Sequence, residues 1–286
     1  MESAPSTNWT AVSGDASIVY NRVSKTGSTA LISLLHAMKG RNSFTLRVEK
    51  PAGFFPSTVQ YVRKLDALPD KSVYVIHADF LELEPYPQRF SWLNTVREPI
   101  SRMASAYYYY VDPNARSPAE IAGEMSRRRG GGVRCSCFRL NFNPCIRQLA
   151  SNSCSFDWLS FSRTQMRRFC SPELGGKSCS LERALRNSKK YAFIGIMEEM
   201  PLVAKALERK FPAYFSGAHR VWLKQSQGGT HIAGRSSQLE AGSISYDARA
   251  LLKTHWKPYA DEAAFYQQMK QRFWYDAVHL GVVAPE

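Results

Sequence analysis

Apolar residues along the chain fall into short continuous runs, separated by stretches in which apolar and polar positions alternate with helical spacing. The runs are rich in β-branched and aromatic residues, and this composition predicts buried strands. Alternation of such strands with amphipathic helices is typical of an α/β protein, with a central, mainly parallel sheet flanked by helices. The predicted strands are SIVYNRV (17–23), KSVYVIH (71–77), SWLNTV (91–96) and KYAFIGI (190–196).

Each predicted helix carries one apolar face, with apolar residues at intervals of three and four. Pro99 suits the first turn of the helix that follows the third strand. The apolar faces are Leu31, Leu34, Leu35 and Met38; Ile100, Met103, Ala104 and Tyr107; Met200, Val203, Ala204 and Leu207; and Tyr259, Ala263, Tyr266, Met269 and Phe273.

The organisation of the chain predicts one domain, residues 17–286, preceded by a flexible lead-in over residues 1–16. Residues 112–180 read as a basic, loop-like insertion that holds all the cysteines. Residues 224–244 form a Gly/Ser-rich loop, and long loops inside compact domains are often functional.

Composition narrows the function classes. The chain has 286 residues, 44% of them hydrophobic, and no apolar run long enough to span a bilayer. Its first residues show no signal peptide, so a targeting segment or anchor of a secretory protein would lie outside this chain. The net charge of +14 creates a field that attracts polyanions, and nucleic acid, anionic lipid and sulfated or uronic polysaccharide all remain open.

The cysteines suggest an oxidising compartment. Zinc sites favour C-x2-C pairs or nearby histidines, which this stretch lacks, so disulfides are favoured over zinc. The tripeptide CSC is too tight for its own two cysteines to pair, and the sequon at Asn8 fits a lumenal chain. The cysteines are Cys135, Cys137, Cys145, Cys154, Cys170 and Cys179.

The junction between the first strand and the first helix predicts an anion site. A strand–turn–helix junction presents free backbone N–H groups and the positive end of a helix dipole, and RVSKTGST adds Lys25 and several hydroxyls there. It is not the loop of nucleoside triphosphatases, since Val19 and Ser24 stand where that motif has glycines. An ordinary capped turn with a solvated lysine is the alternative.

Two further positions fall at ends of predicted strands, where ligands of α/β sheets gather. Arg97 ends one strand, and Ser105 follows in the next helix. His77 ends another, and a neutral imidazole is a suitable base for a hydroxyl proton. A structural ion pair for Arg97 and an ordinary core or surface role for His77 are the alternatives.

Taken together, YNRVSKTGST, HADFLEL, VREPISRMASAYYYY and FIGIMEEM resemble, in order, motifs of the Golgi uronyl and heparan sulfate 2-O-sulfotransferases. The resemblance runs from about residue 18 to 280. It implies transfer of sulfate from 3′-phosphoadenosine-5′-phosphosulfate (PAPS) to the 2-hydroxyl of iduronic or glucuronic acid in heparan, dermatan or chondroitin sulfate. It also implies a metal-free reaction, a homotrimer, and a Golgi-lumenal enzyme whose type II membrane anchor is absent from this chain.

The resemblance assigns roles to particular residues. His77 would be the catalytic base, Lys25 would stabilise the leaving phosphate, and Arg22 would lie beside the phosphosulfate. Arg235, in the long loop, would reach the adenosine end. The remaining donor-binding positions would be Thr26, Gly27, Ser28 and Thr29 at the 5′-phosphosulfate, and Arg97 and Ser105 at the 3′-phosphate.

The same resemblance bears on the insertion. It implies two short disulfides, Cys145–Cys154 and Cys170–Cys179, and leaves Cys135 and Cys137 unassigned. Val75 stands where heparan-type enzymes have a second histidine, so the uronic acid and the glycosaminoglycan stay open. The basic loop would line the acceptor path, with a solvated loop or nuclear-type basic patch as the alternative; its arginines are Arg127, Arg128, Arg129, Arg134 and Arg139.

Three rival functions remain. A sulfotransferase could act at another position, such as a 6-hydroxyl or a protein tyrosine. A non-catalytic protein that binds glycosaminoglycans or nucleic acid would explain the charge alone. A P-loop kinase is disfavoured by the missing glycines.

Overall fold

The computed structural model describes most of the chain, and its residues form two compact units. The first unit comprises Met1–Arg97, Gln165–Ile232 and Phe265–Glu286, and the second comprises Glu98–Thr164 and Ala233–Ala264. Each unit therefore combines segments that lie far apart in the sequence. The structure describes residues 16–49, 58–81, 89–111, 140–151, 164–170, 179–227 and 244–284.

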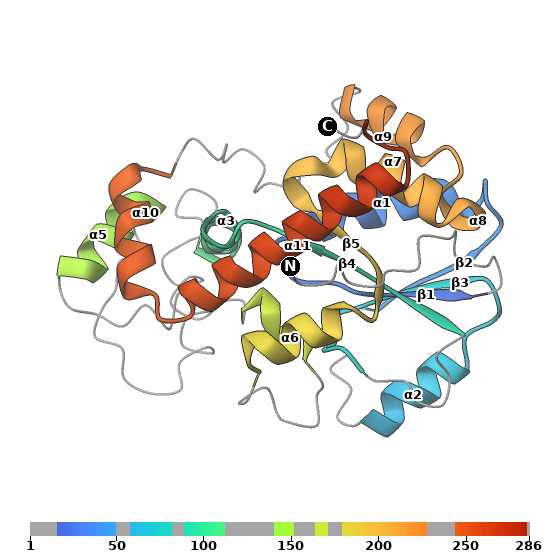
Figure 1. The fold of residues 1–286 in the computed structure, drawn as a ribbon, viewed down its shortest axis with the longest axis horizontal. Helices are drawn as coiled ribbons and strands as arrows, with labels where there is room; N and C mark the ends of the chain where they lie inside the picture. The colour runs from blue at the N-terminus through green and yellow to red at the C-terminus, as the bar shows by residue number, and fades with distance from the viewer. Residues whose placement is uncertain are drawn as a thin grey trace. The chain divides into compact units, whose positions relative to one another are not determined.

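A five-stranded parallel sheet forms the centre of the first unit (Figure 1). Its strand order is β2-β3-β1-β4-β5. The inner strands β1, β3 and β4 and the edge strand β5 are buried along almost their whole length, as expected for a parallel sheet covered on both faces. The α/β prediction is thus confirmed. The strands are β1 (Ser17–Asn21), β2 (Thr45–Val48), β3 (Ser72–Ile76), β4 (Phe90–Val96) and β5 (Tyr191–Ile196).

The strand register brings the carboxyl ends of four strands to one edge of the sheet. Asn21, the last residue of β1, is opposite Ile76, the last residue of β3. Val96 of β4 is likewise opposite Ile196 of β5. Whatever follows these strands in the chain therefore starts from a common edge.

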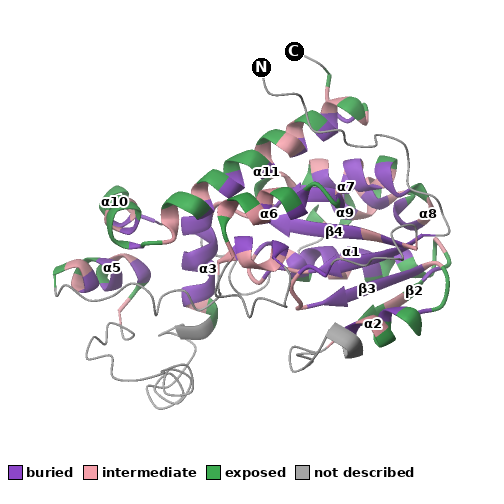
Figure 2. Cartoon of the chain, turned by 60° about the horizontal axis from the view of Figure 1, so that its bottom comes forward, coloured by how far each residue is buried: buried purple, intermediate pink, exposed green. Residues whose placement is uncertain are grey.

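Helices cover both faces of this sheet (Figure 1). The predicted apolar face of α1, from Leu31 to Met38, is fully buried, as is that of α7 from Met200 to Leu207 (Figure 2). On one face α1, α7, α8 and α9 pack together, and α2 and α6 lie on the other. Their bounds are α1 (Ser28–Lys39), α2 (Thr58–Asp66), α6 (Leu181–Ser188), α7 (Met200–Lys210), α8 (Pro212–Phe215) and α9 (Ala218–Gln227).

The second unit is helical and has its own apolar core. Ile100, Tyr107, Ile146 and Trp256 are among its buried residues. Glu98 caps the first helix, because its carboxylate accepts hydrogen bonds from the first backbone N–H groups, including that of Ser101 at 2.8 Å. The helices are α3 (Pro99–Val111), α5 (Phe142–Ser151), α10 (Tyr246–His255) and the beginning of α11 (Tyr259–His279), which continues into the first unit.

Several elements differ from the sequence prediction. The edge strand β2 and the helix α2 were not predicted. The insertion was expected to be loop-like, yet α5 and the 3-10 helix η2 (Gln165–Phe169) lie within it. Cys145 is fully buried on the apolar face of α5, so a residue counted only as a disulfide partner is also a core residue. The first residues of the loop expected from residue 224 belong instead to α9, which continues through Gln227; residues 228–243 lie outside the described residues.

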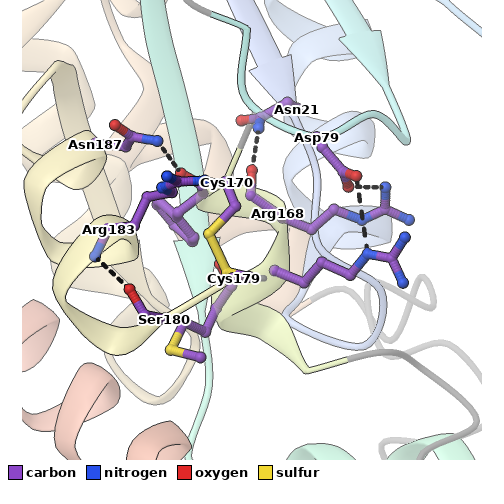
Figure 3. The surroundings of a disulfide bond; sticks show 11 residues. Asn21, Asp79, Arg168, Cys170, Cys179, Ser180, Arg183 and Asn187 are labelled. Atoms are coloured by element: carbon purple, nitrogen blue, oxygen red, sulfur yellow. Dashed lines mark hydrogen bonds and ion pairs between the residues drawn. A yellow bond between two sulfur atoms is a disulfide. The ribbon is translucent and has the colours of Figure 1, made fainter. Parts of the chain in front are cut away.

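The disulfide Cys170–Cys179, implied by the resemblance, is confirmed, with an S–S distance of 2.02 Å (Figure 3). It joins the end of η2 to the residue before the cap of α6. Cys145 is also disulfide-bonded. Its expected partner Cys154 lies outside the described residues, as do Cys135 and Cys137. No helix in the described part of the chain is long and apolar enough to cross a bilayer.

Candidate active site at the carboxyl edge of the sheet

The carboxyl edge of the sheet gathers most of the predicted site residues of the first unit. Arg22 and Lys25 follow β1, His77 follows β3, and Arg97 follows β4. Strands β1 and β4 are neighbours in the sheet. The strand that follows β1 in the chain, β2, lies at one edge of the sheet, whereas the strand that follows β4, β5, lies at the other edge. Ligands of open α/β sheets bind where neighbouring strands diverge in this way.

The loop between β1 and α1 has an unusual backbone conformation. Lys25 has a φ of 68° and Gly27 a φ of 82°, both in the left-handed region. For a lysine this conformation costs about 1–2 kcal/mol, and such strain is often found at ligand sites. Gly27 is the N-cap of α1, where no side chain caps the helix and the first turn holds no acidic residue. The first N–H groups of α1 and its dipole therefore suit an anion.

Hydrogen bonds of buried hydroxyl groups hold this loop in place. The Thr26 hydroxyl donates to the Val23 carbonyl at 3.0 Å and lies 3.2 Å from the Thr95 hydroxyl of β4. Thr95 in turn contacts the Tyr20 hydroxyl at 2.8 Å. The Thr26 hydroxyl hydrogen is thus used within the protein, and an anion would meet Thr26 through its backbone N–H.

The next positions of the loop differ in their exposure. Ser28 is 7% exposed, whereas Thr29 is exposed. Gly27 lies against Met197, which follows β5, so closely that a Cβ on Gly27 would clash with the Met197 sulfur. The loop and the FIGIMEEM segment therefore pack against each other.

Lys25 and Arg97 form a cationic pair at the divergence of β1 and β4. The Arg97 guanidinium donates to the Lys25 carbonyl at 3.5 Å. Fully buried Gln165 fixes the Arg97 backbone, accepting from its N–H at 3.1 Å and donating to its carbonyl at 2.9 Å. Burial, and then the charge of Arg97, lowers the pKa of Lys25 to about 8. A bound anion would offset this repulsion.

His77 is held in one tautomer. Its Nδ1 lies 3.2 Å from the Arg22 carbonyl, which can only accept, so Nδ1 carries the hydrogen and Nε2 keeps its lone pair. Burial first, and then the charges of Arg22 and Arg168, lowers the pKa of His77 to about 4, against a smaller opposing effect of the Arg22 hydrogen bond. His77 is therefore neutral near pH 7, as a general base must be.

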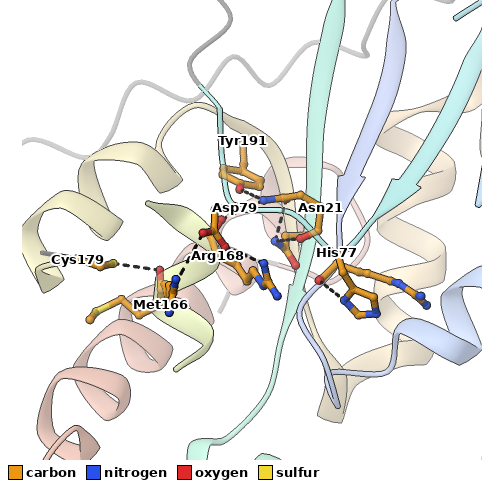
Figure 4. A network of polar contacts seen from close by, with 10 residues as sticks. Asn21, His77, Asp79, Met166, Arg168, Cys179 and Tyr191 are labelled. Carbon is orange, nitrogen blue, oxygen red and sulfur yellow. Dashed lines mark hydrogen bonds and ion pairs between the residues drawn. The ribbon is translucent and has the colours of Figure 1, made fainter. Parts of the chain in front are cut away.

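A polar network beside His77 was missed in the sequence (Figure 4). Asp79 accepts a 2.7 Å hydrogen bond from Arg168 of η2 and lies 3.9 Å from Arg167. Asn21, at the end of β1, donates to the Arg168 carbonyl at 3.0 Å and to the Tyr191 hydroxyl at 2.7 Å. An aspartate two residues after the candidate base in HADFLEL was the available signal, but its partner lies 89 residues away.

The remaining predicted residues belong to the second unit or lie outside the described residues. Ser105 lies on α3 in the second unit, where its hydroxyl is buried and has no hydrogen-bond partner among the described residues. No cluster of three metal-ligating side chains occurs in the ranges that the structure describes. Arg235 and the insertion arginines lie outside those ranges; the latter are Arg127, Arg128, Arg129, Arg134 and Arg139.

Comparisons with known proteins identify the family of the chain. A profile of the sulfotransferase family matches residues 9–213. Heparin sulfate O-sulfotransferase of Drosophila melanogaster is 26% identical over 237 residues, covering 78% of this chain and 63% of the relative. Heparan sulfate 2-O-sulfotransferase 1 of Xenopus laevis is 24% identical, covering 93% and 72%. Uronyl 2-sulfotransferase of Mus musculus is 26% identical, covering 72% and 50%.

The aligned part thus spans between half and about three quarters of these curated relatives. A solved mouse sulfotransferase in complex with adenosine 3′,5′-bisphosphate (PAP) is 15% identical to this chain. The alignment covers 91% of this chain and 95% of the mouse protein, with a TM-score of 0.27. At that TM-score it does not locate individual residues. The family profile, however, covers well over half of the 286 residues, and the chain belongs to the sulfotransferase family.

Proposed function

We propose that the protein transfers sulfate from PAPS to the 2-hydroxyl of a uronic acid, iduronic or glucuronic, in heparan sulfate or in dermatan or chondroitin sulfate. The observation that carries the proposal is that a loop suited to bind an anion and a neutral histidine lie at the same carboxyl edge of the sheet. Lys25 lies just before the uncapped start of α1, and His77 follows the adjacent strand β3. The names of the relatives, which include 2-O- and uronyl 2-sulfotransferases, favour the uronic acid.

The residues at this edge suit a bisphosphorylated donor. Lys25 and the N–H groups of residues 26–29 would hold the 5′-phosphosulfate, together with the hydroxyls of Ser28 and Thr29. Arg97 and Ser105 remain the proposed contacts of the 3′-phosphate, from the family resemblance. Arg235 remains the proposed contact at the adenosine end.

The mechanism is an in-line transfer in which the protein positions groups and supplies charge. His77 Nε2 would take the proton of the attacking hydroxyl, whose oxygen forms a bond to sulfur. The bond between sulfur and the bridging phosphate oxygen breaks, and adenosine 3′,5′-bisphosphate (PAP) leaves. Lys25, next to Arg22, would stabilise the negative charge that develops on the bridging oxygen.

The setting of this activity is part of the proposal. The disulfides favour an oxidising compartment, and the Golgi lumen is where polysaccharides of this class meet PAPS. The charge of +14 favours a polyanionic acceptor, whose path the insertion arginines would line. A homotrimer is proposed from the family resemblance.

A sulfate-transfer assay tests the proposal. PAPS is offered with desulfated heparin, dermatan and chondroitin, and the product disaccharides are analysed. His77→Ala should abolish sulfation at uronic C2, whereas His36→Ala, which changes an exposed histidine on α1, should leave it unchanged.

The other outcomes separate the rivals. Sulfation at another position would keep the donor and overturn the 2-O assignment. An absence of transfer, combined with an absence of PAP binding, would favour a non-catalytic glycosaminoglycan-binding protein.

A further inference from the structure

Arg168 is a partly buried cation whose charge acts on the candidate base from a different part of the chain. It lies on η2, and its side chain is 13% exposed. Within the described residues Asp79 is the hydrogen-bond partner of its guanidinium, through Nη1 at 2.7 Å. A guanidinium has five N–H donors, so this contact leaves donors for a second carboxylate.

The backbone at Arg168 is firmly held. Its carbonyl accepts hydrogen bonds from the Phe80 N–H at 2.8 Å and from the Asn21 side chain at 3.0 Å. The neighbouring Phe169 is fully buried, with its ring 4.8 Å from that of Tyr191. Arg168 is thus fixed to β1 and to the HADFLEL segment, and Figure 4 shows its guanidinium on the side of the network toward His77.

The charged groups that act on His77 come from three segments of the chain. Arg22 approaches from the loop after β1 and Arg168 from η2, and both disfavour protonation of the imidazole. Asp79, on the segment that carries His77, is paired with Arg168. In the absence of a further anion, His77 is surrounded by excess positive charge and is a weak base.

A uronic acid brings the missing negative charge. Its carboxylate is carried on the same ring as the 2-hydroxyl and is ionised near neutral pH. A planar guanidinium binds carboxylates through paired hydrogen bonds, which makes Arg168 better suited to this group than a lysine would be.

We propose that Arg168 binds the carboxylate of the uronic acid whose hydroxyl faces His77, and that Asp79 positions Arg168 for this contact. The inference rests on the proposed function and assigns the acceptor-binding role to a residue outside the recognised motifs. The carboxylate would also offset the field at His77, so acceptor binding would increase the basicity of the imidazole.

The first test pairs two acceptors with matched variants. One acceptor is a uronate oligosaccharide, and the other is the same oligosaccharide with its carboxylates reduced to alcohols. Arg168→Gln should lower kcat/KM for the uronate by about 30-fold, the loss expected for a charged hydrogen bond, mainly through KM. For the reduced acceptor the change should be under about threefold, and Arg168→Lys should recover part of the loss.

Controls show that the effect is local. Arg186→Gln removes an exposed arginine of α6 and should change neither acceptor. PAP affinity of Arg168→Gln should match that of the parent protein, and its thermal midpoint, although lowered by the loss of the Asp79 ion pair, should stay well above the assay temperature. Asp79→Asn should reproduce the acceptor-dependent rise in KM.

A second measurement follows His77 directly. In ¹⁵N-histidine NMR titrations with PAP bound, the uronate oligosaccharide should raise the pKa of His77 in the parent protein. In Arg168→Gln the pKa should already be higher without acceptor, and it should rise less when the uronate is added.

Equal losses on both acceptors, or a His77 pKa that the uronate leaves unchanged, would overturn the role of Arg168 while the transfer activity stands. If the parent protein transfers sulfate to neither acceptor, the proposed function itself is wrong, and this inference falls with it.

Discussion

Lys25 carries two energetic penalties that an ordinary loop lysine does not have. Its backbone is in the left-handed region, and its half-buried ammonium lies beside Arg97. The folded-state pKa of about 8 is below the ordinary value of 10.5, so the folded protein disfavours the charged lysine. Stability therefore rises between about pH 8 and 10.5, and the penalty is fully present at pH 7.

Lys25→Met should consequently separate stability from function. At pH 7 we expect the free energy of unfolding to increase by about 1–2 kcal/mol, after allowance for solvent screening, since the buried charge is removed. PAP affinity should fall by about 100-fold with the loss of the cation. Thermal unfolding and calorimetric titration measure the two effects, and exposed Lys39→Met at the other end of α1 is the control. Lower stability with unchanged PAP affinity would contradict this account.

The pH dependence of kcat/KM below pH 7 should reveal the environment of His77. With a pKa of about 4 in the free protein, kcat/KM should stay nearly constant from pH 7 down to pH 5. An unperturbed histidine would lose roughly 25-fold over that range. Because kcat reports the bound complex, its acid limb should lie at higher pH if the acceptor carboxylate binds Arg168. A kcat/KM profile that bends near pH 6.5 would show that burial and the two arginines do not lower the pKa of His77 as described.

The candidate site was predictable only where a motif is continuous in sequence. Lys25 and His77 are recognisable because a strand, a turn and a helix start leave local signals, and both lie at the predicted edge. The Asp79–Arg168 pair depends on the path of the chain through the insertion back to the sheet, which no local pattern encodes. The engagement of the Thr26 hydroxyl with Val23 was equally invisible from residue type.

Among the elements, η2 has the greatest influence on the site for its length. It supplies Gln165, which fixes the Arg97 backbone, and Arg168, which lies by His77. Its end is joined to the cap of α6 by the Cys170–Cys179 disulfide. The covalent link therefore acts on the element that holds both Arg97, the proposed donor contact, and Arg168, the proposed acceptor contact.

Replacing both cysteines by serine should weaken the fold and the site at once. The bridge closes a loop with a sequence separation of 9, for which the chain-entropy relation gives about 2–3 kcal/mol. For a chain of 286 residues this corresponds to a fall of about 3–5 °C in the thermal midpoint. Calorimetry and acceptor KM measure the result, and treatment of the double variant with reductant gives the combined contribution of the disulfides that remain, including that of Cys145. A wild-type midpoint and KM would show that η2 is held by packing alone.

Prediction of the elements succeeded where burial is complete. The strands β1, β3, β4 and β5 are apolar runs because helices cover both faces of the sheet. The edge strand β2 reads TLRV and is largely exposed, so it lacks the apolar run on which the prediction relied. Its place in the sheet comes from its parallel pairing with β3.

Across the entire chain, the charge of +14 should govern how a polymeric acceptor is captured. Electrostatic attraction is screened beyond about 10 Å at 0.1 M salt. We expect kcat/KM for a long polysaccharide to fall by about 10-fold between 50 and 500 mM NaCl, as charge steering is lost. A tetrasaccharide should lose less, because it reaches fewer of the basic residues. Equal salt dependence for the two acceptors would mean that the salt acts on contacts at the carboxyl edge of the sheet and not on the capture of the polymer.

The strand order also has a consequence for synthesis on the ribosome. The strand β4 ends at Val96, but β5, which pairs with it, begins only at Tyr191. At typical translation rates, about 5–20 s pass between the synthesis of β4 and the synthesis of β5. During this interval an apolar strand has unpaired backbone groups along one side, which is a template for association with other chains. Nascent chains that stop short of β5 are therefore the ones we expect to aggregate or to be held by chaperones.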